Sequence, residues 1–205
     1  MAERMPWSRR RELLEMPPEA PVRIWSFQHP AALDAARARG WLSGDHGHTG
    51  AGDAEEMRNG NGFWRAYGWM RGRMAERIPG FSGEAPVWAW VKRPSAKPMD
   101  AWRTDVIRIT ASVPRGRMLL SDEDAWHAVL NGRPYSLTEA ESDTGTGSVG
   151  AFATSPTWER IFDLSPRTGE QALWCGQPEY VQACVDRIYL NEILAVRTMP
   201  RKPPR

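Results

Sequence analysis

The chain has 205 residues, with 27 basic and 25 acidic side chains, and 41% of its residues are hydrophobic. This length and composition indicate one soluble globular domain and exclude a disordered chain. A net charge of +2 gives no electrostatic argument for nucleic acid as a partner, and no apolar run approaches the roughly 20 residues that span a membrane. Two cysteines are too few for a disulfide framework, so we expect a cytoplasmic protein.

Three segments follow from the distribution of proline, charge and apolar residues. Residues 1–21 predict a partly disordered N-terminal arm with one short helix near residues 9–16. Residues 22–199 predict a single domain, and residues 200–205, rich in proline and charge, predict a disordered tail.

The domain opens with a strand and a helix. β-branched and aromatic residues dominate 22–27, which is typical of a strand. Pro30 then suits the first turn of a helix, and Gly40 is placed to end it. Glycine and polar residues fill 43–62, which indicates a long loop.

The next segment predicts a helix followed by two strands. Phe63, Tyr67, Met70 and Met74 recur at the spacing of one helical face. A strand at 86–92 places Trp88 and Trp90 on the same side. A second strand at 106–113 alternates four apolar residues with polar ones, among them Arg108, Thr110 and Ser112.

The second half predicts short elements. Ser121 is expected to cap a helix that ends near residue 131, and residues 140–150 are expected to form a flexible loop. Ser155 should cap another short helix, and strands are expected at 181–188 and 193–199. This mixed order indicates an α+β fold, with a mainly antiparallel sheet and peripheral helices.

A metal centre is one candidate site. His46 and His48 follow Asp45 within four residues, and His127 is the further imidazole that a metal-dependent enzyme could use. A catalytic metal, however, usually needs a ligand fixed on a rigid element, and glycines flank the first two histidines. We therefore expect no metal.

Polar residues on strands form the other candidate site. Ser26 and Gln28 lie on one side of the first strand, beside what we expect to be a sheet edge, and Gln182 begins a late strand just after Glu179. Strands hold such side chains rigidly, which favours a binding role. A plain alternation of solvent-facing residues explains the same pattern.

The chain resembles the bacterial family catalogued as domain of unknown function 3841. The motifs that carry this resemblance are RIWSFQ at 23–28, Gly40-Trp41-Leu42, AYGWM at 66–70, PVWAWVKRP at 86–94, LLSDEDAWHAVLN at 119–131, WERIFDL at 158–164 and VQA at 181–183. The resemblance runs from residue 22 to about residue 199. The family name implies no activity.

The opening strand and helix, and the closing turn Leu190-Asn191-Glu192 with the strand after it, also resemble ADP-ribosyltransferase-like folds. That resemblance implies NAD or a related nucleotide as ligand and transfer of ADP-ribose as activity. It assigns NAD contacts to Ser26, Gln28, Trp88 and Trp90, and catalytic roles to Gln182 and Glu179.

One departure from that family concerns the catalytic group. Transfer passes through a ribose cation, which a carboxylate stabilises better than the amide of Gln182. Eleven tryptophans and many arginines support an alternative, a non-catalytic module that binds a protein or peptide, because Trp and Arg anchor such interfaces.

Overall fold

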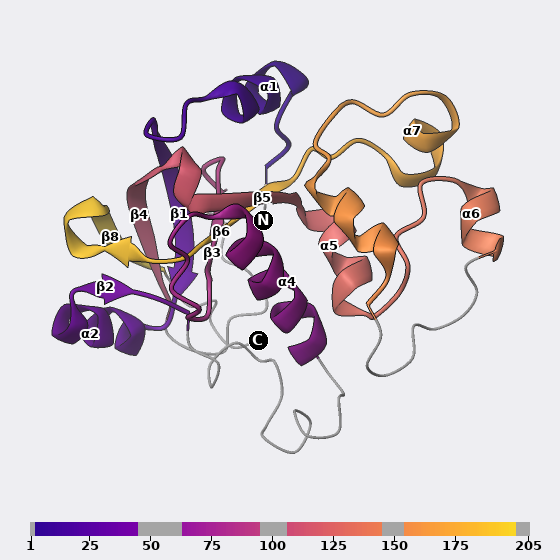
Figure 1. Cartoon of the computed structure of the whole chain (residues 1–205). Coiled ribbons are helices and arrows are strands. Elements are labelled where there is room, and N and C mark those ends of the chain that lie inside the picture. The colour runs from indigo at the N-terminus through magenta and orange to yellow at the C-terminus, as the bar shows by residue number, and fades with distance from the viewer. Residues whose placement is uncertain (1–2, 45–62, 95–105, 145–153, 200–205) are drawn as a thin grey trace, which may run out of the picture.

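The computed structural model describes residues 3–44, 63–94, 106–144 and 154–199, and it confirms an α+β fold with a mainly antiparallel sheet (Figure 1). The helices are α1 (Trp7–Glu15), α2 (Pro30–Arg39), α4 (Trp64–Arg77), α5 (Glu123–Leu130), α6 (Glu139–Thr144) and α7 (Gly169–Cys175), with 3-10 turns η2 (Arg115–Arg117), η3 (Pro156–Phe162) and η4 (Leu190–Glu192). The strands are β1 (Pro21–Gln28), β2 (Trp41–Leu42), β3 (Val87–Trp90), β4 (Val106–Pro114), β5 (Met118–Asp122), β6 (Val181–Val185), β7 (Ile188–Tyr189) and β8 (Ile193–Met199).

None of the helices in the described part of the chain is long and apolar enough to cross a membrane. Most of the loop predicted at 43–62, and the second half of the loop predicted at 140–150, lie outside the described residues.

Six strands form one sheet in the order β5-β6-β3-β1-β4-β8, and every neighbouring pair is antiparallel. β1 pairs with β4 along its whole length, but with β3 only where Trp25 lies opposite Trp90. β1 is therefore an inner strand. The expectation that Ser26 and Gln28 lie beside a sheet edge is wrong, because β3 and β4 flank β1 on both sides. A separate two-stranded sheet joins β2 and β7.

One face of the sheet carries the larger apolar core, and we call it the core face. Alternate residues of β4 from Ile107 to Val113 point to this side, and all of them are buried, which confirms the predicted alternation. The same core contains Leu13 of α1 and Leu33 of α2. Both helices therefore pack on this face, so the N-terminal segment that was predicted as an arm contributes to the core.

The opposite face, which we call the aromatic face, is covered over part of its width. Met70 and Met74 of α4, Trp126 of α5 and Trp158 of η3 form a cluster with Cys184 of β6. The two methionines confirm the predicted apolar side of the helix at 63–74. No described residue of this cluster comes from β1, β4 or β8, so the helices cover only the β3-β6-β5 half of the face.

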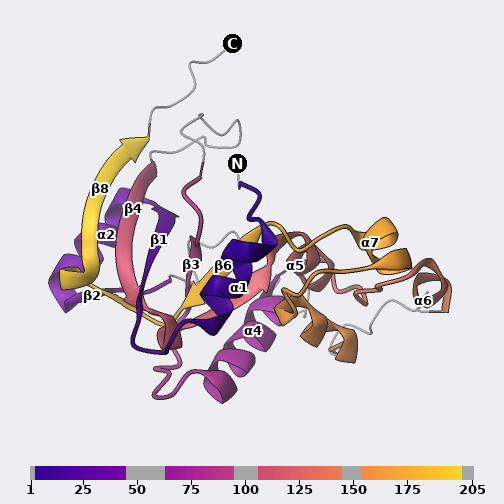
Figure 2. The same cartoon turned by 90° about the horizontal axis from the view of Figure 1, so that it is seen from above.

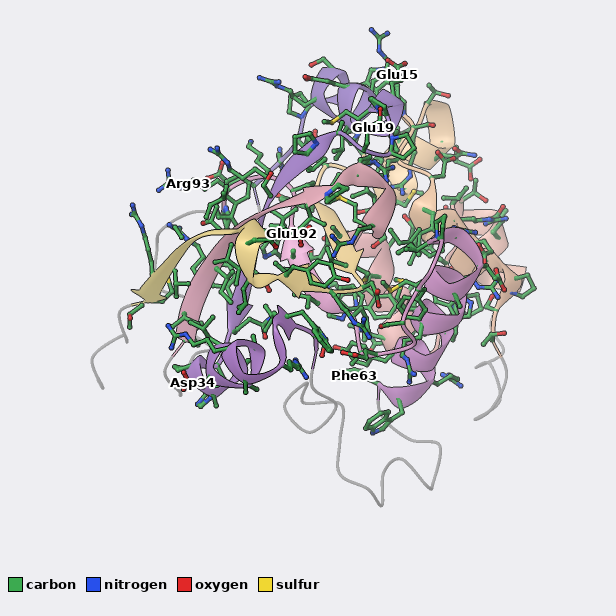
Figure 3. All side chains as sticks on the ribbon, turned by 60° about the vertical axis from the view of Figure 1, so that its left-hand side comes forward. Glu15, Glu19, Asp34, Phe63, Arg93 and Glu192 are labelled. Atoms are coloured by element: carbon green, nitrogen blue, oxygen red, sulfur yellow. The ribbon has the colours of Figure 1, made fainter. Side chains whose placement is uncertain are left out.

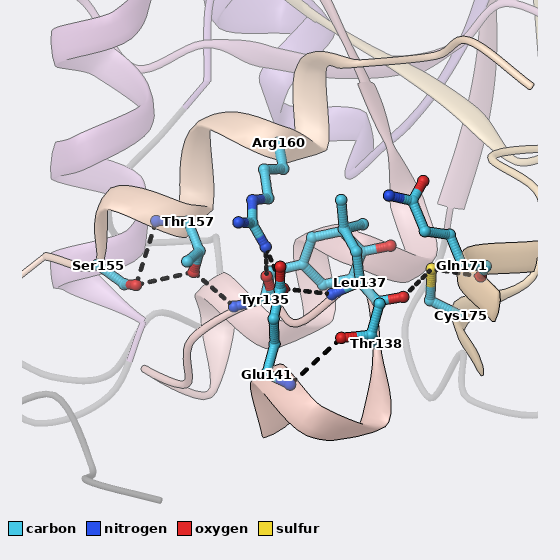
Figure 4. Close-up of polar contacts among 9 residues, drawn as sticks. All are labelled: Tyr135, Leu137, Thr138, Glu141, Ser155, Thr157, Arg160, Gln171 and Cys175. Atoms are coloured by element: carbon cyan, nitrogen blue, oxygen red, sulfur yellow. Dashed lines mark hydrogen bonds and ion pairs between the residues drawn. The ribbon is translucent and has the colours of Figure 1, made fainter. Parts of the chain in front are cut away.

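The helices between β5 and β6 in the sequence gather at one end of the molecule. Figure 2 shows α5, α6 and α7 beyond β5, with β8 at the opposite end of the sheet. Polar contacts fasten the loop after α5 to η3: the Tyr135 backbone N–H donates to Thr157 Oγ1 at 2.8 Å, and Arg160 pairs with Glu141 (Figure 4). These contacts hold the segment after α5 against η3.

Helix α2 forms as its sequence predicts. Pro30 lies in the first turn, where its missing N–H costs no hydrogen bond. Gly40 ends the helix with a φ of 96°, a conformation that side chains other than glycine rarely adopt. Likewise, α1 occupies nearly the range expected for a short helix.

The chain after β4 differs most from the prediction. Residues 118–122 form β5, so Asp122 and not Ser121 caps α5, accepting a hydrogen bond from the Asp124 N–H. Residues 140–144 are helical, and α7 was not predicted. The strand expected at 181–188 is two strands in different sheets, because Asp186 interrupts it and accepts hydrogen bonds from Ser82.

Candidate functional site

The register of the sheet brings Trp90 and Gln182 together. Trp90 lies opposite Trp25 of β1 on one side and opposite Gln182 of β6 on the other. Directly paired residues point to the same face of a sheet, so all three side chains belong to the aromatic face. Trp88, two residues before Trp90, shares that face, as the sequence predicted.

Ser26 and Gln28 are not part of this group. Ser26 follows Trp25, so its side chain points to the core face, where it is 1% exposed. Its hydroxyl donates to the Trp88 carbonyl at 2.7 Å, and Gln28 Nε2 donates to Ser26 Oγ at 2.7 Å. The first bond joins β1 to β3, whose register otherwise pairs Trp25 with Trp90, and the second lies within β1. The predicted NAD-binding role of Ser26 and Gln28 stays a prediction, with the two side chains on the other face from Trp90.

Glu179 lies before β6 and off the strand. Its carboxylate pairs with Arg4 at 3.3 Å, and its backbone carbonyl accepts from the Met5 N–H at 2.7 Å. Glu179 therefore fastens the N-terminal segment beside β6, and it does not share the row of Gln182.

Trp88 is a packing residue. Its ring lies 4.8 Å from the Trp126 ring and meets the Tyr67 ring edge-on at 5.7 Å. Burial raises the pKa of the Tyr67 hydroxyl, as expected for a phenol inside such a cluster. Trp88 thus packs against α4 and α5, and its predicted contact with a ligand stays a prediction.

A continuous row of paired residues crosses the aromatic face, one from each strand of the sheet. This central row consists of Ser121, Gln182, Trp90, Trp25, Thr110 and Ala195. Trp25 and Trp90 are half-buried neighbours at its middle. Gln182 is 6% exposed and donates from Nε2 to Ser121 Oγ at 3.2 Å. The row is uncharged throughout and exposes part of two indole rings.

Arg108 lies in the adjacent row, and its place in the sequence pattern did not indicate a site residue. It is paired with Phe27 of β1 and with Arg197 of β8. Although only 5% exposed, it has no hydrogen-bond partner for Nε, and no ion pair joins it to any residue that the structure describes. Burial lowers the pKa of its guanidinium, and the charges of Arg93 and Arg197 lower it further. The polar alternation of β4 was the available signal, but alternation alone indicates a solvent-facing arginine.

Arg93 and Arg197 are the exposed members of this arginine group. Figure 3 shows Arg93 at the rim of the molecule, and Arg197 lies on the edge strand β8. Both side chains are exposed, whereas Arg108 is buried between β1 and β8. The group therefore combines one buried cation with two accessible ones.

Of the three histidines considered for a metal centre, His127 is the one that lies in the described part of the chain. His46 and His48 lie outside the described residues. His127 Nε2 lies 3.3 Å from Glu123 Oε1 on the surface of α5. Within the described ranges, no group of three histidine, cysteine, aspartate or glutamate side chains could hold a metal ion.

Many tryptophans and arginines contact each other inside the chain. The Arg187 guanidinium lies 4.6 Å from the Trp41 ring centre, and that of Arg65 lies 5.6 Å from the Trp158 ring centre. On α7, by contrast, Leu173 is 89% exposed and Trp174 is 45% exposed. Leu173 and Trp174 are therefore exposed apolar side chains on the surface of α7.

Comparison with known proteins identifies a family but no activity. No curated protein and no solved structure gives a significant match to the chain. One family model matches residues 23–144, which is more than half of the chain. This range includes Trp25, Trp90, Arg108 and Thr110, while Gln182 and Arg197 lie beyond it. The chain belongs to the family described as Domain of unknown function (DUF3841).

Proposed function

We propose that the protein binds NAD or a related nucleotide on the aromatic face, in an ADP-ribosyltransferase-like domain. The observation that carries this proposal is the pair of half-buried tryptophans, Trp25 and Trp90, which lie opposite each other in the strand register of an uncharged row. Planar bases and the nicotinamide ring stack on aromatic side chains, and such stacking contributes about 1–3 kcal/mol per ring. Thr110 and Gln182 flank the pair and bring hydrogen-bonding groups to its two sides.

The central row has no acidic side chain, which favours ligand binding over group transfer. A ribose cation needs a nearby anion, but the central row contains no acidic side chain. Gln182 is an amide, and Glu179 is paired with Arg4 away from the row. We therefore expect a nucleotide complex, with ADP-ribosyl transfer slow or dependent on a carboxylate from an acceptor.

Calorimetric titration with NAD and with ADP-ribose tests the proposal. We expect saturable binding to the wild type and an affinity about 5- to 160-fold weaker for Trp25→Ala, the range that corresponds to loss of one stacked ring. Trp174→Ala is the matched control, because it removes an exposed tryptophan on α7. Ser26→Ala should also bind normally, since Ser26 points to the core face.

Two results would contradict the proposal. Absence of binding with both ligands at millimolar concentration would remove the nucleotide from consideration. Equal weakening by Trp25→Ala and Trp174→Ala would show that the ligand does not use the central row.

A second candidate function, a non-catalytic module for a protein or peptide, is favoured by the exposed side chains of Leu173 and Trp174. Large exposed apolar residues often belong to protein interfaces. In that case a stoichiometric partner should copurify with the untagged wild type and be lost with Leu173→Asp. A partner that this variant retains would contradict the location.

A further inference from the structure

Two arginines face each other across β4 and β8 with no acidic residue on either strand. Arg108 and Arg197 are direct partners in the register, and such partners have Cβ atoms about 4.5–5.5 Å apart. Like charges at this position destabilise a sheet. The sequences of β4, VIRITASVP, and of β8, ILAVRTM, contain no carboxylate that could neutralise them. The protein's own strands therefore leave this repulsion uncompensated.

Arg108 also differs from the other buried arginines of the described chain. Arg10 donates to the carbonyls of Met5 and Leu164, and Arg167 pairs with Asp122. The Arg108 side chain is also largely buried and makes no hydrogen bond or ion pair with any described residue, but of its guanidinium nitrogens only Nε is a buried atom without a partner. A buried charge is normally paired because leaving water is costly. In Arg108 a buried Nε donor without a partner lies beside a second cation, and a bound anion would supply both a hydrogen-bond acceptor and a counter-charge.

We propose that Arg108 and Arg197 bind the diphosphate group of a nucleotide, with the Thr110 hydroxyl as a neighbouring donor. The guanidinium group suits this ligand, since its planar set of donors matches phosphate oxygens two at a time. Thr110 follows Arg108 by two residues on the same face, about 7 Å along the strand. Ala195, opposite Thr110, adds only a methyl group there.

The identity of the ligand rests on the proposed function. The spacing of the two rows supports the idea that a single nucleotide contacts both of them. Trp25 is the direct neighbour of Thr110, and Phe27 is the direct neighbour of Arg108. A base on Trp25 and Trp90 therefore lies one row from the arginine pair. That separation suits a nucleotide, whose ring and phosphates are joined through a ribose.

The test uses inorganic pyrophosphate as a probe that needs no aromatic contact. We expect it to raise the melting temperature of the full chain and to bind in calorimetry, because a ligand of the folded state stabilises it. Arg108→Met should weaken pyrophosphate binding by roughly tenfold or more, the value of a charge-assisted hydrogen bond pair. Arg23→Met is the matched control: Arg23 lies on the same face of β1, opposite Ser112, and is exposed.

Further variants keep the result interpretable. Arg197→Met changes an exposed residue and should weaken pyrophosphate binding even if Arg108→Met folds poorly. Arg108→Lys, which retains the charge without the planar fork, should recover part of the affinity. Equal pyrophosphate binding by Arg108→Met, Arg197→Met and Arg23→Met, or no binding by the wild type, would overturn the arginine site.

Titration of the same variants with NAD separates the two proposals. If pyrophosphate binds through Arg108 but NAD does not bind, the arginine site holds as an anion site and the nucleotide proposal fails. If NAD binds equally to the wild type and to Arg108→Met, the nucleotide proposal holds and the arginine site is overturned.

Discussion

Two buried arginines of this protein have opposite surroundings. Arg167 lies beside Asp122 at 2.9 Å and also donates to the carbonyls of Cys175 and Gly176. Burial lowers the pKa of Arg167, but Tyr135 and Asp122 raise it by more, so the net shift is upward. Arg108 has no such partner among the described residues, and its pKa is lowered. The comparison separates a cation that holds the fold together from one that is available to a ligand.

The largest expected effect comes from breaking the paired site. Asp122→Ala leaves Arg167 buried without its counter-charge and should lower the free energy of unfolding by about 3–5 kcal/mol. Denaturant unfolding measures this loss. Asp124→Ala is the control, since Asp124 is exposed at the same end of α5 and should cost about 1 kcal/mol or less. An equal loss of unfolding free energy in both variants would show that the buried ion pair contributes no more to stability than an exposed aspartate.

Removing the unpaired arginine should stabilise the protein instead of destabilising it. Arg108→Met eliminates a buried charge and a like-charge contact with Arg197, so without added anion it should raise the free energy of unfolding by about 0.2–1 kcal/mol. Arg167→Met, measured beside it, should be destabilising. If the two methionine variants lost stability equally, the contrast between the arginines would disappear.

A third arginine, paired near the surface, is expected to give an effect as small as that of Arg108→Met. Arg187 Nη2 lies 2.6 Å from Glu84 Oε1, and Glu84→Gln should lower the free energy of unfolding by about 0.2–1 kcal/mol at neutral pH. Burial raises the pKa of Glu84, but hydrogen bonds from Ser43, Trp41 and Arg187 lower it by more.

The sign of the pH dependence at Glu84 follows from this downward shift. A carboxyl whose pKa is depressed in the folded state contributes stability above its unfolded pKa, which is lost as the pH falls through the folded pKa. The difference between wild type and Glu84→Gln should thus be present at pH 7 and vanish well below the ordinary value of 4.5. Thermal melts of both proteins across this range check it, and a difference that grows in acid would contradict the assignment.

Local sequence patterns were sufficient where an element is determined by its own residues. The spacing of Met70 and Met74, the alternation of β4, and the pair Pro30 and Gly40 predicted real elements. They could not predict that β1 lies inside the sheet or that β5 exists, because both depend on strands far away in the sequence.

The same limit applies to the candidate site. Alternation correctly placed Trp88 and Trp90 on one face, but only the packing of α4 and α5 shows that Trp88 is occupied while Trp90 borders Trp25. Arg108 had the pattern of a solvent-facing residue. Its burial depends on the tertiary structure, in which β4 lies between β1 and β8, and no local pattern contains this arrangement.

The strand order has a consequence for synthesis of the chain on the ribosome. β6 lies between β5 and β3, yet it follows β5 by about 60 residues. At about 5–20 residues per second, β5 and β3 emerge several seconds before the strand that joins them. Until then their inner edges are unpaired, which exposes them to other nascent chains. The last third of the chain therefore completes the sheet, and a fragment that ends with the family match at residue 144 should not fold.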